Sequence, residues 1–221
     1  MSNHNKFGVL FDSDGVILNT EPQYDLFWNE QGKLFHPELP NFARYLKGFS
    51  LTKTLNTYFN DNNENREIVI KRLYDFEDKM KYEYLPGSHE LLQSLKSKNI
   101  PIALVTSSND DKMKKIIRCH PEFNDFFTSI ITEDKVSKTK PDPECYINGA
   151  KAISVDPTKC VVFEDSVAGI RAGKEAGCFV IGLTTTQPKE AVEKLADIVV
   201  ENLSKISYEY ITNCIVPNLY K

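Results

Sequence analysis

Short apolar runs alternate with longer amphipathic stretches over most of the chain. The runs are rich in Val, Ile, Leu and Phe, which is typical of strands that are buried on both faces in a parallel sheet. We predict six strands, at residues 7–11, 102–105, 129–132, 160–163, 179–183 and 198–200. Helical spacing in the stretches between them predicts helices from residue 88 and over 111–119, 142–153, 167–176, 188–196 and 203–215. This alternation specifies a parallel sheet with helices on both faces.

Residues 21–85 interrupt the alternation. The segment is rich in aromatic and charged residues, and apolar side chains recur in it at helical spacing, for example at Tyr24, Phe27 and Trp28. A Pro-Gly pair then ends it. We predict an α/β protein with a doubly wound, Rossmann-like core formed by residues 1–20 and 86–221, and an inserted α-helical cap subdomain formed by residues 21–85.

Composition narrows the possible functions. The chain has 221 residues, of which 41% are hydrophobic and 26% charged, so it can bury a sizeable core. Its formal net charge of -4 gives no basic surface for nucleic acid, and no apolar run reaches the length of a membrane span. The five cysteines include no Cys-x-x-Cys pair, and no apolar stretch precedes the first strand. We therefore expect a cytoplasmic monomer without disulfides, zinc, nucleic-acid partners or membrane contacts.

The first strand ends at two carboxylates, Asp12 and Asp14, which are spaced two residues apart. Ligands of open α/β sheets bind at the carboxyl ends of the strands, and residues at i and i+2 lean the same way. Two like charges this close need a cation or a proton between them. The same residues are also consistent with a turn that only closes the strand, so other strand ends must decide between the two interpretations.

Polar residues follow two more strands. Residues 106–109 (Thr-Ser-Ser-Asn) follow the second, where hydroxyl and free backbone N–H groups suit either a phosphate site or a helix N-cap. The acids Glu164 and Asp165 follow strand 160–163 and offer the oxygen ligands that Mg²⁺ prefers. Lys140 precedes a proline that opens a helix, and it either lies over the strand ends or is an ordinary surface lysine.

Other features contribute less chemistry. Gly169, Gly173 and Gly177 recur every four residues, which predicts a smooth helix stripe that packs closely on the sheet. Their spacing does not match a P-loop. The four histidines lie outside the strand ends and no Gly-x-Ser-x-Gly motif is present, so the sequence offers no serine-hydrolase site.

Residues 11–16 (Phe-Asp-Ser-Asp-Gly-Val) and 19–22 (Asn-Thr-Glu-Pro), with the three later motifs in order, resemble the haloacid dehalogenase-like phosphotransferases. The branch with small-molecule phosphatases and β-phosphoglucomutase is most similar. The resemblance implies that the catalytic residues are Asp12, Asp14, Thr106 and Lys140. It implies a Mg²⁺ site formed by Asp12, Asp165, the backbone carbonyl of Asp14 and, from beside them, Glu164. For substrate binding we assign Ser107, Ser108, Asn109, Thr20, Tyr24, Lys47 and Gly48.

These parts predict a Mg²⁺-dependent phosphatase that hydrolyses a small phosphomonoester through an aspartyl-phosphate intermediate. By resemblance the substrate is a sugar phosphate, and the cap closes over it. The alternative is a β-phosphoglucomutase-type mutase. Against it, Leu51 stands where that mutase carries an arginine for a second phosphate, and Tyr24 replaces a histidine of many relatives, although Lys47 could compensate.

Three other classes fit the sequence less well. Dehalogenation of 2-haloacids needs neither Asp14 nor the acids at residues 164 and 165. A receiver-type signalling switch is about half this length and places its acceptor aspartate in the middle of the chain. A non-catalytic relative would lack a motif residue, and none is missing here.

Overall fold

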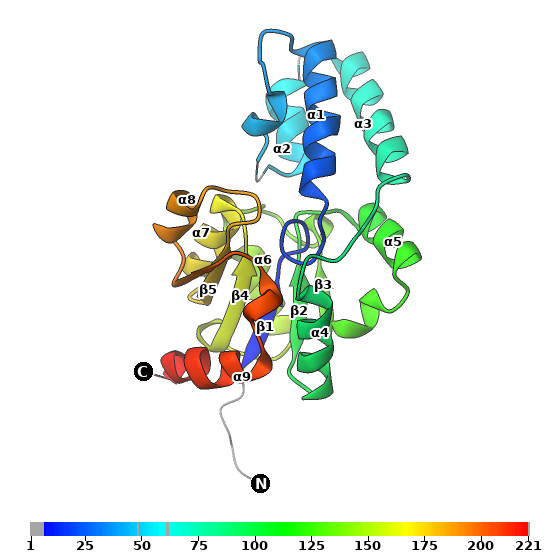
Figure 1. The fold of residues 1–221 in the computed structure, drawn as a ribbon. Coiled ribbons are helices and arrows are strands. Elements are labelled where there is room, and N and C mark those ends of the chain that lie inside the picture. The colour runs from blue at the N-terminus through cyan, green and yellow to red at the C-terminus, as the bar shows by residue number, and fades with distance from the viewer. Residues whose placement is uncertain (1–6, 48, 61, 221) are drawn as a thin grey trace.

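The computed structural model describes residues 7–47, 49–60 and 62–220, and these contain a six-stranded parallel sheet (Figure 1). The strands lie in the order β3-β2-β1-β4-β5-β6. Their bounds are Gly8–Phe11 (β1), Ile102–Val105 (β2), Ser129–Ile131 (β3), Cys160–Glu164 (β4), Phe179–Leu183 (β5) and Ile198–Val200 (β6). Phe11 pairs with Leu104 of β2 and with Phe163 of β4, so the carboxyl ends of these three strands lie side by side.

Helices cover both faces of the sheet, because successive strand residues point to opposite faces. Val9 and Phe11 pack on one face with apolar residues of α4, α5 and the C-terminal segment. Leu10 and Val162 pack on the other face with α6, α7 and α8. The helices are α4 (Ser88–Ser97), α5 (Asp110–Cys119), α6 (Glu144–Ala152), α7 (Val167–Glu175), α8 (Lys189–Glu193) and α9 (Tyr208–Tyr210). This is the predicted doubly wound α/β architecture.

A second group of helices lies beyond the carboxyl ends of the strands (Figure 1). This helical insert consists of α1 (Glu21–Phe35), a 3₁₀ helix (Phe42–Tyr45), α2 (Leu51–Tyr58) and α3 (Asn63–Glu77). It has a hydrophobic cluster of its own, separate from those on the sheet, formed by Phe42, Leu46, Leu55, Phe59 and Val69. The chain enters and leaves the insert through adjacent segments, because Leu18 and Tyr84 form an antiparallel bridge. Its extent over residues 21–85 as a subdomain stays a prediction.

Short polar side chains fix where several helices begin. Ser50, Asn62, Asn109 and Ser166 each precede a helix and accept a backbone N–H from three residues further on. Such N-caps satisfy donors that have no partner within the helix. Because Asn109 and Ser166 come shortly after β2 and β4, the helices α5 and α7 begin at the edge of the sheet where the strands end.

Gly177 is not part of the predicted glycine stripe. The helix α7 ends at Glu175, and Gly177 has a φ of 84°, in the left-handed region that favours glycine. The N–H of Gly177 donates to the carbonyl of Lys174, and the N–H of Cys178 donates to that of Gly173. This pattern is a common helix ending, so the third glycine terminates the helix while only the first two pack inside the protein.

The last part of the chain is less regular than predicted. The helix α8 covers residues 189–193 rather than 188–196, and segment 203–215 divides into several short helical turns. It divides because Ser207 has an extended backbone and accepts the N–H of Tyr210, which starts a new helix. Among the described residues, we find no helix with the length and apolar character that crossing a membrane requires.

Candidate active site

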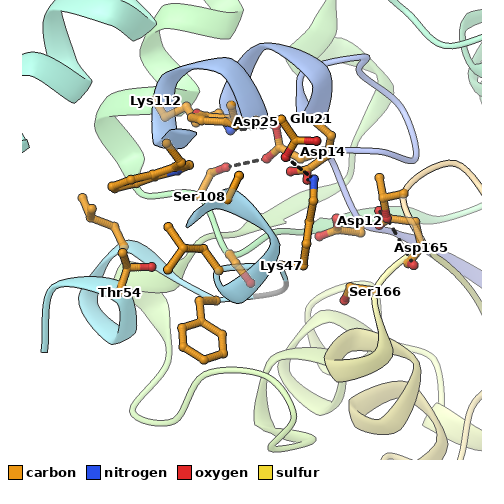
Figure 2. Close-up of a pocket in the computed structure, with 18 of the residues that line it drawn as sticks. Asp12, Asp14, Glu21, Asp25, Lys47, Thr54, Ser108, Lys112, Asp165 and Ser166 are labelled. Carbon is orange, nitrogen blue, oxygen red and sulfur yellow. Dashed lines mark hydrogen bonds and ion pairs between the residues drawn. The ribbon is translucent and has the colours of Figure 1, made fainter. Parts of the chain in front are cut away.

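Side chains from three neighbouring strand ends meet in one pocket. Asp12 follows β1, the loop with Ser107 and Ser108 follows β2, and Asp165 follows β4. The pocket has a volume of about 160 Å³ and lies between these strand ends and the helical insert, with Asp12, Asp14 and Asp165 in its lining (Figure 2). The strand order reverses at β1, which lies between β2 and β4, and open α/β sheets bind ligands at such a point.

Lys140 lies within the acidic group at the strand ends. Its ammonium donates to Asp12 Oδ1 at 2.8 Å, to Glu164 Oε1 at 2.6 Å and to the Val105 carbonyl at 3.1 Å. These bonds use all three of its N–H donors, and the side chain is only 5% exposed. Burial acts to lower the pKa of Lys140, but the charges of Asp12 and Glu164 outweigh it and raise that pKa. This geometry excludes the surface-lysine interpretation.

Asp12, Glu164 and Asp165 form a candidate metal centre. One carboxylate oxygen of each lies within 4.8 Å of the others, and all three residues are buried. Burial raises the pKa of Asp12 to about 7; the Lys140 charge opposes this shift, and the Glu164 charge adds to it. Burial and the charges of Glu164 and Asp12 raise the pKa of Asp165 well above its ordinary value. Three carboxylates against one lysine leave negative charge that a divalent cation would offset, and an all-oxygen donor set fits Mg²⁺.

Glu164 and Asp165 are held by different partners. Glu164 Oε1 accepts hydrogen bonds from Lys140 and, at 2.8 Å, from the Tyr146 hydroxyl, while Oε2 accepts the backbone N–H groups of Asp165 and Ser166. Asp165 lines the pocket and accepts a hydrogen bond from Thr186. Glu164 is fully buried and its acceptor sites are occupied, so we infer that it supports the metal centre while Asp12 and Asp165 face the pocket.

Asp14 is bound by three donors. Lys112 Nζ donates to Oδ1 at 2.7 Å, and the Ser108 hydroxyl donates to Oδ2 at 2.9 Å (Figure 2). The Thr20 hydroxyl also donates to Oδ1. Burial acts to raise the pKa of Asp14, but the Lys112 charge and these hydrogen bonds outweigh it and lower that pKa. Thr20 is fully buried and is not one of the residues that line the pocket, and its hydroxyl bonds to Asp14; its assignment to substrate binding stays a prediction.

The loop after β2 lines the pocket and also caps a helix, while its role as a phosphate site stays a prediction. Ser107, Ser108 and Asn109 line the pocket. Asn109 also caps α5, because its side chain accepts the N–H of Lys112 at 2.9 Å. Thr106 is buried, and its hydroxyl oxygen accepts the N–H of Ser108 at 3.0 Å. That bond does not use the hydroxyl hydrogen of Thr106, and Thr106 itself is not one of the residues that line the pocket.

Lys47 is already paired with acids of the helical insert. Its Nζ lies 2.8 Å from Glu21 Oε2 and 2.5 Å from Asp25 Oδ1 (Figure 2). Burial acts to lower the pKa of Lys47, but the two carboxylates outweigh it and raise that pKa. The lysine therefore lines the pocket as part of a neutralised cluster. Gly48, its predicted neighbour in substrate binding, lies outside the described residues.

The rest of the insert's side of the pocket is largely aromatic and apolar. Tyr24 lines the pocket and donates its hydroxyl to Glu77 at 2.9 Å. Trp28, Phe49 and Leu51 add apolar surface. Leu51, the residue that counted against a mutase in the sequence, thus lines the pocket.

Sequence reasoning does not find three residues that hold the acids in place: Lys112, Tyr146 and Thr186. Thr186 offered a usable signal, since residues 184–186 are three threonines directly after the buried strand β5. Lys112 lies in the first turn of α5, just after the polar loop, but a basic helix predicts a solvent-facing lysine equally well. Tyr146 offered no such signal, because a tyrosine on an apolar helix face is usually an ordinary core residue.

Replacing Gly169 with alanine is expected to disturb the site through Glu164. An added Cβ would lie 1.7 Å from Glu164 Oε1, and that carboxylate cannot move without losing its hydrogen bonds to Lys140 and Tyr146. We expect a loss of about 1–3 kcal/mol in the free energy of unfolding, measured by urea denaturation. Glu175→Ala, at an exposed position of the same helix, is the control. Equal stability of the Gly169→Ala and wild-type proteins would contradict this packing.

Comparisons with known proteins agree with the geometry. A β-phosphoglucomutase of Bacillus subtilis is 32% identical over 214 residues, which cover 91% of this chain and 92% of that protein. A validoxylamine A 7'-phosphate phosphatase of Streptomyces hygroscopicus subsp. limoneus is 29% identical over 211 residues, covering 92% and 97%. The crystal structure of a family IA HAD hydrolase from Entamoeba histolytica superposes with a TM-score of 0.81, at 22% identity, covering 97% of this chain and 100% of that one.

The comparison with protein families gives the classification. The family described as haloacid dehalogenase-like hydrolase matches residues 9–183, which run from β1 to the end of β5 and include every predicted motif. This confirms the family, the fold class and the enzyme class that the sequence predicted. The chain therefore belongs to the haloacid dehalogenase-like hydrolases.

Proposed function

We propose that this enzyme is a Mg²⁺-dependent phosphatase that hydrolyses a small phosphomonoester, a sugar monophosphate in particular, through an aspartyl-phosphate on Asp12. The observation that supports it most is the placement of Asp12 in the pocket, with Lys140 and Asp165 beside it and Asp14 two residues further on. Relatives named as phosphatases, such as the phosphorylated carbohydrates phosphatase of Thermotoga maritima, are consistent with this substrate class.

Two steps complete the proposed reaction. An oxygen of Asp12 attacks the phosphorus, the bond to the ester oxygen breaks, and the departing alcohol takes its proton from the protonated form of Asp14, which the lowered pKa makes the minor form. Asp14 then takes a proton from water, and the water oxygen attacks the phosphorus and releases phosphate and the Asp12 carboxylate. Thr106 and Lys140 stabilise the transferred group in both steps. Bound Mg²⁺, held by Asp12, Asp165 and the Asp14 carbonyl, would supply positive charge that lets the carboxylate approach the phosphate.

The pocket favours a monophosphate over the bisphosphate that a mutase must bind. A second phosphate needs a free cation in the helical insert. Leu51 supplies none, and Lys47 is held by Glu21 and Asp25, which a second phosphate would have to displace. The acids around Lys47 instead suit hydroxyl groups of a sugar or polyol, which can donate hydrogen bonds to them.

We propose that the helical insert acts as a cap. Its own hydrophobic cluster and its two adjacent connections at Leu18 and Tyr84 allow it to move as a unit over the pocket. Closure would exclude bulk water and bring Lys47 and Tyr24 to the part of the substrate that does not react. Composition further leads us to propose a cytoplasmic monomer that acts on a small metabolite.

A panel of phosphate esters tests the proposed function. We expect phosphate release from hexose and polyol monophosphates with Mg²⁺ present, loss of that activity on chelation with EDTA, and recovery when Mg²⁺ is added back. Because Asp12, Glu164 and Asp165 leave the pocket negatively charged, activity without a divalent cation is expected to fall to background. Turnover that is independent of Mg²⁺, or interconversion of glucose 1- and 6-phosphates without phosphate release, would contradict the proposal.

A further inference from the structure

One face of α5 contacts both Asp14 and the helical insert. Lys112, Lys115 and Arg118 are spaced three residues apart, so they lie along the same side of this helix. Lys112 binds Asp14 at 2.7 Å, Lys115 binds Glu77 at 3.2 Å and Arg118 binds Asp78 at 3.1 Å. Glu77 and Asp78 lie at the end of α3, where the insert returns to the core. The helix thus contacts both Asp14 and the insert with neighbouring cations.

Of these three cations, Lys112 is the one that binds Asp14, the proposed acid and base. Its side chain is 6% exposed, and its Nζ lies 4.5 Å from the centre of the Tyr24 ring. Tyr24 belongs to α1 and donates its hydroxyl to Glu77. The ammonium is therefore held between the Asp14 carboxylate and an aromatic ring of the insert, where it is attracted by both.

The hydrogen bonds at Asp14 are unequally divided between its two oxygens. Lys112 and Thr20 both donate to Oδ1, whereas Ser108 donates to Oδ2. This arrangement fixes the plane of the carboxyl group and leaves Oδ2 with more free acceptor capacity among the described contacts. A carboxyl group that transfers protons to and from a substrate needs its reacting oxygen held within hydrogen-bond reach.

We propose that Lys112 is a positioning residue for proton transfer: it holds the Asp14 carboxyl group so that Oδ2 faces the leaving oxygen, and it links this orientation to the cap through Tyr24. The inference rests on the proposed function, in which Asp14 is the acid and base. Lys112 acts through Asp14, so its loss lowers kcat/KM most for the esters whose leaving groups most need a proton.

The experiment compares an alkyl monophosphate with p-nitrophenyl phosphate, whose leaving group departs as a stable anion without a proton. The parameter is kcat/KM, because it covers the steps up to departure of the alcohol. For Lys112→Met we expect kcat/KM to fall for the alkyl ester by a factor at least about ten times larger than the factor for the aryl ester. The reason is that a misplaced acid matters only where the leaving group needs a proton. Lys112→Arg is expected to restore much of the alkyl activity.

Two further variants complete the design. Lys114→Met removes a lysine of the same helix whose side chain is 75% exposed and paired only with Asp111 among the described contacts, and it is expected to match the wild type for both esters. Lys112→Gln keeps a donor without the charge, and it gives the same comparison if Lys112→Met fails to fold.

The outcomes separate this inference from the proposed function. An unchanged ratio of the two kcat/KM values in both Lys112→Met and Lys112→Gln, with or without an equal loss for both esters, would overturn it. So would a gain in alkyl activity. If the wild-type protein hydrolyses neither ester, the proposed function itself fails, whatever the variants do.

Discussion

Replacing Asp12 with asparagine is expected to lower phosphate release by at least about 10³-fold. The amide is not a nucleophile, and it also removes one of the charged oxygens that face the candidate metal centre. The substitution keeps the shape of the side chain, and the amide oxygen can still accept the hydrogen bond from Lys140. Initial rates with a hexose monophosphate and saturating Mg²⁺ measure the effect.

Thermal unfolding of the same variant separates lost chemistry from lost structure. Burial and neighbouring acids disfavour the Asp12 carboxylate, which is why its pKa is raised to about 7. Asp12→Asn is therefore expected to be as stable as the wild type or more so. Asp125→Asn, at an exposed position of the core, is the control and should change neither activity nor stability. Wild-type turnover by Asp12→Asn would show that the nucleophile is assigned wrongly.

Replacing Lys140 with methionine is expected to reduce both stability and activity. The ammonium binds Asp12 and Glu164 in a buried site, so its removal leaves two carboxylates without their counter-charge. Breaking a buried ion pair by removing one partner costs about 3–5 kcal/mol in the free energy of unfolding. We also expect kcat to fall by about 10²–10³-fold, because a charge that stabilises the transferred phosphoryl group is lost.

Lys138→Met provides the matched control for this variant. Lys138 lies two residues earlier in the same loop, its side chain is 71% exposed, and its ion pair with Asp142 is 3.5 Å long. Surface pairs of this kind contribute about 0–1 kcal/mol, so urea denaturation and kcat are both expected to stay near wild-type values. Equal stability and equal kcat of Lys138→Met and Lys140→Met would contradict the role assigned to Lys140 in the site.

The sequence predicts the fold and the strand-end residues for one physical reason. Strands buried on both faces show as continuous apolar runs, and parallel strands bring their carboxyl ends to the same edge of a sheet. The polar residues that end such runs, at Asp12, Thr106 and Asp165, therefore come together although they are distant in the chain. Lys140 follows no strand directly, and only the resemblance to the family pointed to it.

What the sequence cannot supply depends on the direction of individual side chains. Thr20 directly precedes α1 and could have capped it, yet its hydroxyl bonds to Asp14. Lys112 and Lys115 lie on a helix rich in lysines, and the sequence alone does not show which of them face inward. The pairing of Lys47 with Glu21 and Asp25 depends on how the loop before α2 packs on α1, which no local pattern specifies.

The covalent intermediate is the most direct test of this account. The enzyme would be mixed with a hexose monophosphate and Mg²⁺, quenched in acid within the first turnover, digested and examined by mass spectrometry. We predict a phosphoryl group on the peptide that contains Asp12, and no such label in the Asp12→Asn protein. A phosphoryl group on another residue, or rapid turnover without any labelled peptide, would contradict it.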